Sequence, residues 1–218
     1  MFERIGVISK IGSCERILDL GCGDGIYTPY LRALASEVIG LDLEPARLEN
    51  TKKLVQVVRA DAVHLPFSEK VFDAIWASEI IEHTPSLGIF RELERVTRKK
   101  IVATMPHPTG PYFGRDPSHI LKYDVHSLKK FLQRRTWNYS VNGLGLCLPF
   151  RLFPNILRKL FMQISWNHPS LSFNILVVGV SPTRSGQGEV HGMHRVEPEE
   201  EHETGEYVQS KNYLAPCR

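Results

Sequence analysis

The segment from Ser78 to His83 brings two acids and a histidine together within a few residues. Its order is Ser78-Glu79-Ile80-Ile81-Glu82-His83, an E-x-x-E-H pattern. On one side of a helical turn, Glu79, Glu82 and His83 would offer oxygen ligands and one nitrogen ligand to a divalent cation. Such an ion lowers the pKa of a bound hydroxyl group and so replaces a protein base. The pattern therefore indicates a candidate metal site.

An acid and several glycines follow an apolar run nearer the start of the sequence. The stretch Ile17-Leu18-Asp19-Leu20-Gly21-Cys22-Gly23-Asp24-Gly25 predicts a strand that opens into a glycine turn. Glycine lacks a Cβ, so its φ can be positive and its amide can approach a bound molecule. The spacing differs from the dinucleotide pattern G-x-G-x-x-G, whose third glycine would fall at Ile26. Asp19 disfavours a phosphate ligand and would face a ligand ammonium group or brace the loop.

Three further segments follow in a recognisable order, from Glu37 to Asp42, from Val58 to Phe67 and from Phe72 to Ser78. Together with the glycine turn, these segments make the chain resemble the class I S-adenosylmethionine-dependent methyltransferases. Within that class the resemblance is to the type 11 methyltransferase domain. The resemblance covers about residues 10 to 135. It implies that S-adenosyl-L-methionine is the cofactor and that the protein is a transferase.

The resemblance also implies which residues contact the cofactor. Asp42 would pair with the two ribose hydroxyls, Asp61 would contact the adenine amino group, and Tyr27 would act as a lid or contact. Ser78 ends the strand that flanks the cofactor. The full implied set is Asp19, Gly21, Gly23, Gly25, Tyr27, Asp42, Leu43, Asp61, Ala62 and Ser78. Taken singly, these acids could instead be loop braces or turn residues, and Asp73 is expected in a turn before its strand.

The E-x-x-E-H segment has a resemblance of its own. It is similar to the metal-ligand segment of methyltransferases that act on catechol-like quinone precursors and on the terminal ribose of small RNAs. In the RNA group a downstream histidine completes the site, a place that His119 could fill. Similar segments occur in family members that need no metal, where the acids solvate the start of a helix and the histidine packs beside the cofactor. Both interpretations stay open.

Alternating strand and helix patterns must position these residues. Apolar strand runs extend from Arg16 to Leu20, Val38 to Leu41, Ala74 to Trp76 and Ile101 to Thr104, with helical periodicity from Ile26 to Leu34 and from Phe90 to Val96. Such alternation predicts an α/β fold, in which parallel strands are covered on both faces and bind ligands at their carboxyl ends. With the resemblance, we expect a Rossmann-like, mostly parallel, seven-stranded sheet. Its antiparallel C-terminal hairpin would use Trp137 to Gly143 and Phe173 to Val180.

Methyl transfer from a sulfonium mainly requires that the nucleophile be held in line with the methyl group. A base is needed only when the acceptor must lose a proton, as a hydroxyl does. The candidates are His83, His107 and His119, each of which could instead be structural. A Pro/Gly-rich loop from Met105 to Gly114 and a helix near Tyr123, capped by Asp124 or Ser127, would support the acceptor side.

The remaining segments bear on substrate and membrane contact. Residues 1–182 are expected to form the methyltransferase domain, with an apolar, basic helical insertion at about 149–166. This insertion would lie on a membrane surface, pack on the edge of the sheet or cap the pocket. From residue 183 the periodicity ends, which predicts a disordered tail. The tail carries a net charge of −3, which leaves +6 on the rest of the 218-residue chain.

Composition and cysteine usage restrict the class of protein. A hydrophobic content of 42% is enough to fill a core. No leader or spanning run is apparent, and the four cysteines show no metal spacing, so a reduced, cytoplasmic protein is expected. The sequence has no stripe of basic residues interleaved with aromatic ones, which is the pattern expected of a protein that binds single-stranded nucleic acid. Nothing in it indicates the oligomeric state.

The leading prediction is methyl transfer to a small-molecule or lipid acceptor. The alternatives are a metal-assisted O-methyltransferase and a non-catalytic partner subunit.

Overall fold

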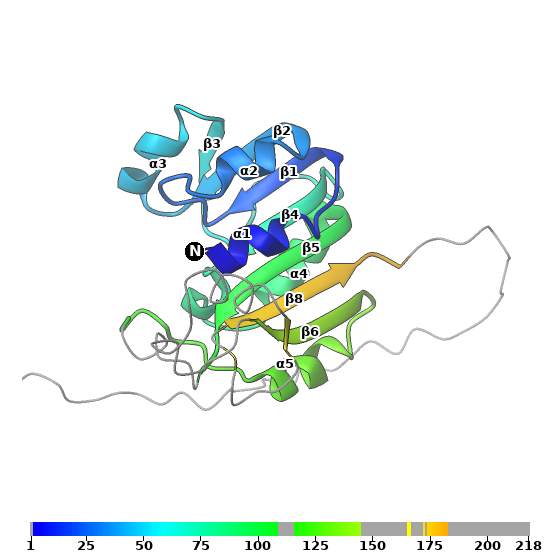
Figure 1. Ribbon diagram of the computed structural model, residues 1–218. Coiled ribbons are helices and arrows are strands. Elements are labelled where there is room, and N and C mark those ends of the chain that lie inside the picture. Colours follow the sequence, from blue (N-terminus) through cyan, green and yellow to red (C-terminus); the bar gives the residue numbers. More distant parts are fainter. Residues whose placement is uncertain (1, 109–115, 145–164, 167–171, 173, 183–218) are drawn as a thin grey trace, which may run out of the picture. The chain divides into compact units, whose positions relative to one another are not determined.

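A computed structural model describes residues 2–108, 116–144, 165–166, 172 and 174–182, and a single β-sheet runs through them (Figure 1). The strand order is β3-β2-β1-β4-β5-β8-β6-β7. The strands are β1 (Cys14–Leu20), β2 (Ala35–Asp42), β3 (Gln56–Arg59), β4 (Phe72–Ser78), β5 (Thr97–Pro106), β6 (Asn138–Leu144), β7 (Ser165–Trp166) and β8 (Asn174–Val180). The described residues all belong to the first of two units, Met1–Thr183 and Arg184–Arg218.

The direction of pairing divides the sheet into two parts. Strands β1 to β5 pair in parallel, whereas β8 pairs antiparallel with both β5 and β6. The predicted mostly parallel sheet with an antiparallel C-terminal hairpin is therefore confirmed, and the two-residue strand β7 is added at its edge.

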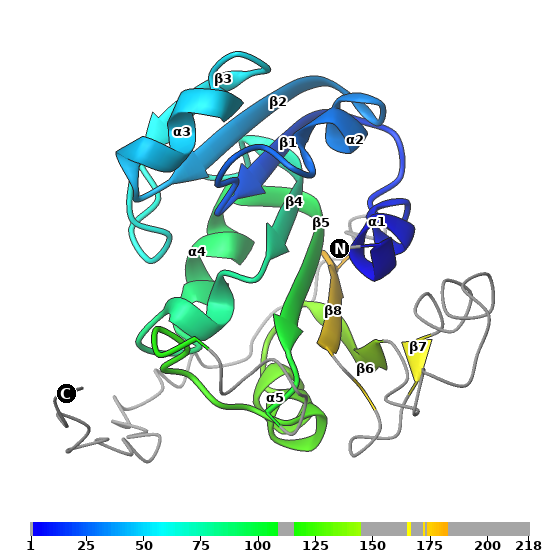
Figure 2. The same cartoon turned by 60° about the vertical axis from the view of Figure 1, so that its left-hand side comes forward.

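Helices cover both faces of the sheet (Figure 2). They are α1 (Phe2–Ile8), α2 (Thr28–Arg32), α3 (Pro45–Thr51), the 3-10 turn η1 (Ile81–His83), α4 (Ile89–Val96) and α5 (Val125–Leu132). Neighbouring strand residues point to opposite faces. Thus Trp76 belongs to the cluster that includes Val7 of α1 and Leu31 of α2, whereas Ile75 belongs to the cluster that includes Phe90 of α4 and Leu128 of α5.

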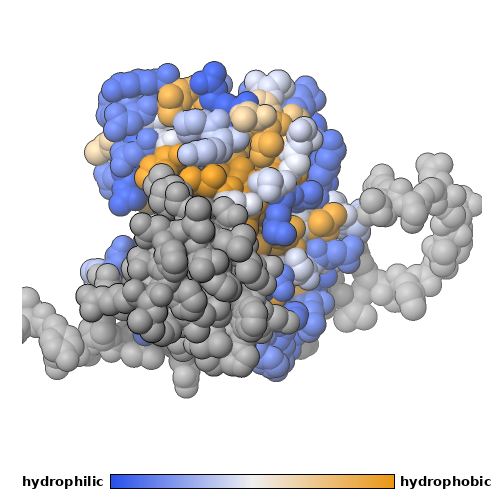
Figure 3. All heavy atoms as spheres, viewed as in Figure 1, coloured by the Kyte–Doolittle hydropathy of each residue, from blue (hydrophilic) through white to orange (hydrophobic). Residues whose placement is uncertain are grey.

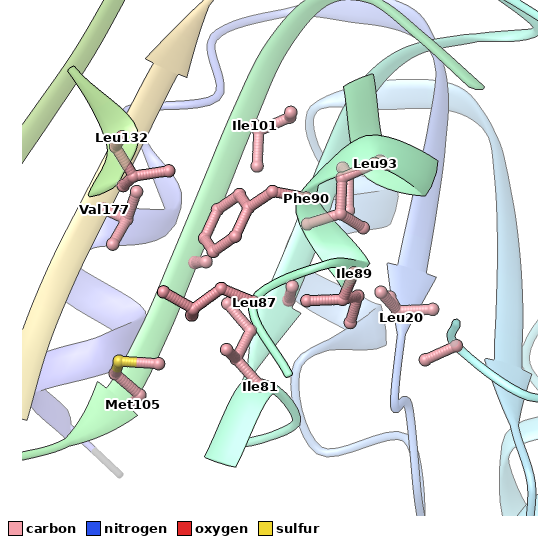
Figure 4. Packing of buried hydrophobic residues seen from close by; sticks show 14 of the residues in the cluster. Leu20, Ile81, Leu87, Ile89, Phe90, Leu93, Ile101, Met105, Leu132 and Val177 are labelled. Atoms are coloured by element: carbon pink, nitrogen blue, oxygen red, sulfur yellow. The ribbon is translucent and has the colours of Figure 1, made fainter. Parts of the chain in front are cut away.

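The second of these clusters is the larger apolar core (Figure 4). Phe90 and Leu93 of α4 lie against Ile101 of β5, and Ile81 of η1 lies next to Leu87 in the same cluster. Because Phe90 is fully buried, its truncation to alanine would cost about 3 to 5 kcal/mol of the free energy of unfolding. This packing fixes η1, and with it the predicted E-x-x-E-H segment, to the carboxyl end of β4.

Several local predictions can be compared with the structure. The helix predicted from Ile26 to Leu34 is shorter, Thr28–Arg32, and Tyr27 occupies its N-cap. Asp124 caps α5, accepting a hydrogen bond from the Ser127 amide at 2.7 Å. The prediction that Asp73 lies in a turn before its strand was wrong. Asp73 lies inside β4, buried, and accepts from the amides of Glu15 and Arg16.

Two predictions concern residues that lie mostly or wholly outside the described parts of the chain. The insertion at 149–166 is described only at its last two residues, and the tail at 183–218 is not described. Among the described residues, none of the helices has the length and the apolar character needed to cross a membrane.

Candidate functional site

The parallel strands bring the predicted cofactor residues to one edge of the sheet. Leu20 of β1 pairs with Leu41 of β2 on one side and with Ala77 of β4 on the other. The residues that follow, beginning with Gly21, Asp42 and Ser78, therefore reach the carboxyl-end edge side by side. Ligands of open α/β sheets bind at such an edge.

The glycine turn after β1 depends on backbone conformations that favour glycine. Gly21, Gly23 and Gly25 have φ values of +67°, +50° and +76°. A Cβ on Gly21 would lie 3.0 Å from Ile80, and one on Gly25 would lie 2.8 Å from Thr51 Oγ1. A Cβ on Gly23 would meet nothing within 4 Å. The turn is thus packed closely on both sides and open at its centre, as a cradle for a ligand must be.

Asp19 lies beneath this turn. Its side chain is 2% exposed and accepts a hydrogen bond from Thr28 Oγ1 at 2.7 Å. Burial, which outweighs the opposing effect of the Thr28 hydrogen bond, raises the pKa of Asp19 to about 7, and the nearby charge of Asp42 adds to the increase. Asp19 therefore braces the start of α2 in this structure.

Asp42 joins the end of β2 to the glycine turn. Its Oδ2 accepts from the Gly23 amide at 2.9 Å and its Oδ1 from the Glu44 amide at 3.0 Å. Each carboxylate oxygen has a further lone pair, so Asp42 can hold the turn and still accept from ligand hydroxyls.

The other residues that the resemblance assigns to the cofactor also lie at this edge, and some are exposed to solvent whereas others are buried. Leu43 is 59% exposed, directly after β2, and Ile26 is 52% exposed, directly after the glycine turn. Asp61 is exposed and accepts from the Val63 amide, whereas Ala62 is buried. Figure 3 shows apolar residues interrupting the hydrophilic surface on the side of the molecule that carries α1. An exposed leucine beside an acid suits a ligand that has both a flat apolar ring and hydroxyl groups.

The end of β4 turns sharply at Glu79. The Ser78 hydroxyl contacts Thr104 Oγ1 at 2.9 Å, so it is engaged with β5. Glu79 has a φ of +55°, and its amide donates to the Thr104 carbonyl. The Glu79 carboxylate forms an ion pair with Arg4 of α1, with a distance of 2.7 Å from Oε2 to Nη2.

Arg4 is a site residue that the sequence reasoning missed. Its Nη1 donates to the Tyr27 hydroxyl at 3.4 Å. The ring of Tyr27 in turn meets Trp76 edge-on, with the ring centroids 5.5 Å apart. Arg4 lies in α1, and the apolar residues Val7, Ile8 and Ile11 near the end of that helix could have predicted a helix there. They could not have predicted where the helix packs.

Glu82, His83 and His119 form a compact group. Their possible ligand atoms all lie within 4.8 Å of one another. Glu82 is 1% exposed, and its carboxylate oxygens have no hydrogen-bond partner among the described residues, although Nε2 of His119 lies 4.0 Å from Oε1. Burial, and then the charge of Glu79, raises the pKa of Glu82 to about 9. Glu79, which the sequence grouped with Glu82 and His83, does not belong to this group among the described residues.

The three candidate histidines are only partly brought together. The rings of His83 and His119 lie 4.8 Å apart, and Nδ1 of His83 contacts the Ser118 hydroxyl at 3.0 Å. Burial, followed by the charge of His119, lowers the pKa of His83. His107 is buried directly after β5, and this burial lowers its pKa. His107 does not belong to the Glu82 group within the described residues.

Comparison with known proteins agrees with this geometry. Residues 18–102 match a family model described as a methyltransferase domain. The malonyl-[acyl-carrier protein] O-methyltransferase of Legionella pneumophila is 39% identical over 105 residues, which are 44% of this chain and 36% of that protein. The biotin biosynthesis bifunctional protein BioHC of Cellvibrio japonicus is 30% identical over 163 residues, or 68% of this chain and 32% of that protein. The chain thus spans about a third of the length of these curated relatives.

Solved structures share the fold. A SAM-dependent methyltransferase from Archaeoglobus fulgidus matches with a TM-score of 0.64 and 18% identity, covering 83% of this chain and 95% of that one. A possible histamine N-methyltransferase from Thermotoga maritima matches with a TM-score of 0.65 and 13% identity, covering 83% and 88%. At these identities the likeness concerns the fold.

Proposed function

The chain belongs to the class I S-adenosylmethionine-dependent methyltransferases, and we propose that it transfers the cofactor's methyl group to a small-molecule or lipid-like acceptor. The observation that carries this proposal is the glycine turn, open at Gly23 and joined to Asp42. The malonyl-[acyl-carrier protein] O-methyltransferase and a tocopherol O-methyltransferase from Arabidopsis thaliana, 32% identical over 93 residues, support the acceptor class.

The residues at the edge fit S-adenosylmethionine. Asp42 would accept from the ribose hydroxyls, Leu43 would cover one face of the adenine ring, and Asp61 would accept from its amino group. The open space at Gly23 leaves room for the methionyl end. When bound, the cofactor supplies an electrophilic methyl group on a sulfonium, so the task of the protein is to orient the acceptor.

A hydroxyl acceptor would also need a base. His83 suits this role because its lowered pKa keeps the imidazole neutral near neutral pH. His107 and His119 are the other candidate bases. Burial also lowers the pKa of His107, and the ring of His119 lies against that of His83. An acceptor that is already anionic, such as a carboxylate, would need none of them.

A methylation screen tests the proposal. The protein is incubated with S-adenosylmethionine labelled in the methyl group and with pools of small carboxylates, phenols, quinone precursors and lipids. We expect label in at least one pool, and its loss in the Asp42→Ala variant. Cofactor binding without label in any pool would favour a non-catalytic partner subunit.

The group around Glu82 favours a second candidate function, metal-assisted O-methylation. A buried carboxylate without a hydrogen-bond partner is costly, and a divalent ion beside two imidazoles would remove that cost. Glu82, His83 and His119 would hold the ion, which would activate an acceptor hydroxyl. This ligand set differs from the one the sequence predicted: Glu79 pairs with Arg4 and is not in the group that the described residues form.

Metal binding can be measured without turnover. Titration of the protein with Mn²⁺ in a calorimeter should give saturable heat in the wild type and in Glu79→Gln, and little in Glu82→Gln or His119→Ala. Equal heat in all four proteins, or methylation unaffected by EDTA, would eliminate the metal-assisted function and leave the first proposal intact.

A further inference from the structure

We propose that Arg4 is a positioning residue that ties α1 across the cofactor edge and fixes the glycine turn from both sides. This inference rests on the proposed function insofar as it concerns cofactor affinity. It assigns to α1, which the sequence analysis left without a role, a task at the site.

The Arg4 guanidinium reaches two segments that are distant in sequence. Nη2 lies 2.7 Å from Glu79 Oε2, directly after β4, and Nη1 donates to the Tyr27 hydroxyl at 3.4 Å. The side chains of Arg4 and Glu79 are only 19% and 25% exposed. Water therefore screens this pair less than it screens an exposed ion pair.

Both segments bear directly on the glycine turn. Glu79 is followed by Ile80, whose side chain lies where a Cβ on Gly21 would meet it at 3.0 Å. Tyr27 comes two residues after Gly25, at the other end of the turn. Arg4 thus bridges the residues that flank the turn at its start and at its end.

The backbone conformation of Glu79 suggests that this bridge serves a ligand site. The Glu79 φ of +55° lies in the left-handed region, which is unfavourable for a residue with a Cβ, so the surroundings must maintain it. Strained residues of this kind gather at ligand sites. The ion pair with Arg4 and the hydrogen bond to Thr104 both hold Glu79 in this conformation.

Loss of the bridge should leave the fold intact. Val7, Ile8 and Ile11 are buried in the core on the same face as Trp76, so α1 stays anchored without Arg4. Removing the guanidinium should therefore loosen the turn and not unfold the protein. The Arg16–Glu37 pair between β1 and β2, with an Nε–Oε2 distance of 2.6 Å, offers a matched control away from the turn.

The experiment compares Arg4→Gln, Arg4→Lys, Glu79→Gln and Arg16→Gln with the wild type. Amide hydrogen exchange in the free protein should accelerate at residues 21–27 in Arg4→Gln and Glu79→Gln, less in Arg4→Lys, and not in Arg16→Gln. Titration with S-adenosylmethionine should show about tenfold weaker binding in Arg4→Gln, because part of the binding free energy must then be used to order the loosened turn.

Two results separate this inference from the proposed function. Wild-type exchange at residues 21–27 in Arg4→Gln, or a change matched by Arg16→Gln, would overturn the positioning role. A wild-type protein that does not bind S-adenosylmethionine would contradict the proposed function, while the exchange measurement still decides the role of Arg4.

Discussion

Asp19→Asn tests whether the carboxyl group beneath the glycine turn carries the pKa that its burial imposes. Burial raises this pKa from 3.8 to about 7, against the hydrogen bond from Thr28. Between those two values the folded protein keeps a proton that the unfolded chain has released. The free energy of unfolding must therefore fall as the pH rises through this window.

The size of the effect follows from the same two pKa values. Linkage gives a loss of about 3 kcal/mol of unfolding free energy between pH 5 and pH 8 from this group alone. The asparagine variant keeps an amide oxygen for the Thr28 hydroxyl and cannot ionise, so its unfolding free energy should lack this loss. The buried Glu82, whose pKa is also raised, is present in both proteins and cancels in the comparison.

Urea denaturation at pH 5 and pH 8 measures the difference. The advantage of Asp19→Asn over the wild type should grow by about 3 kcal/mol from the lower to the higher pH. Asp24→Asn is the matched control, because Asp24 lies in the same turn but is exposed. A difference between Asp19→Asn and the wild type that is the same at both pH values would show that burial does not raise the pKa of Asp19 in the folded protein.

Two further predictions follow from the same edge of the sheet, and a third concerns residues 149–166. Asp42→Ala should weaken S-adenosylmethionine binding by about 1 to 3 kcal/mol in a calorimetric titration, and unchanged affinity would contradict the ribose assignment. Gly25→Ala should lower the free energy of unfolding by about 2 kcal/mol or more, because its methyl group would strike Thr51. Gly23→Ala, with open space around it, should cost only about 1 kcal/mol of stability and mainly reduce cofactor affinity, so equal losses of stability in the two variants would contradict this geometry. If residues 149–166 contact a membrane, the full chain should float with anionic liposomes and a deletion of that segment should not, and equal failure to float would remove the idea.

Local patterns predicted the elements that depend on nearby residues. The glycine turn, the strands around it and the Asp124 cap all follow from spacings of a few residues, and the structure contains them. Their positions at one edge followed from the rule that parallel strands share their carboxyl ends. The resemblance added the cofactor, which no single spacing could identify.

Long-range contacts account for what the sequence did not predict. Asp73 was expected in a turn because acids are common there, but the amides of Glu15 and Arg16 satisfy it inside the sheet. Arg4 acquires its role from Glu79, a residue 75 positions away along the chain. Glu79 pairs with Arg4 and lies outside the group of Glu82, His83 and His119 among the described residues. Nothing in the E-x-x-E-H spacing could reveal it.

We propose that the edge formed by Gly21, Gly23 and Asp42 binds the methyl donor. Calorimetric titration of the full chain with S-adenosylmethionine measures this binding without turnover. We expect one saturable site per chain, weakened in Asp42→Ala and retained in Asp24→Asn. A folded wild-type protein that gives no heat of binding would show that this edge is not the cofactor site.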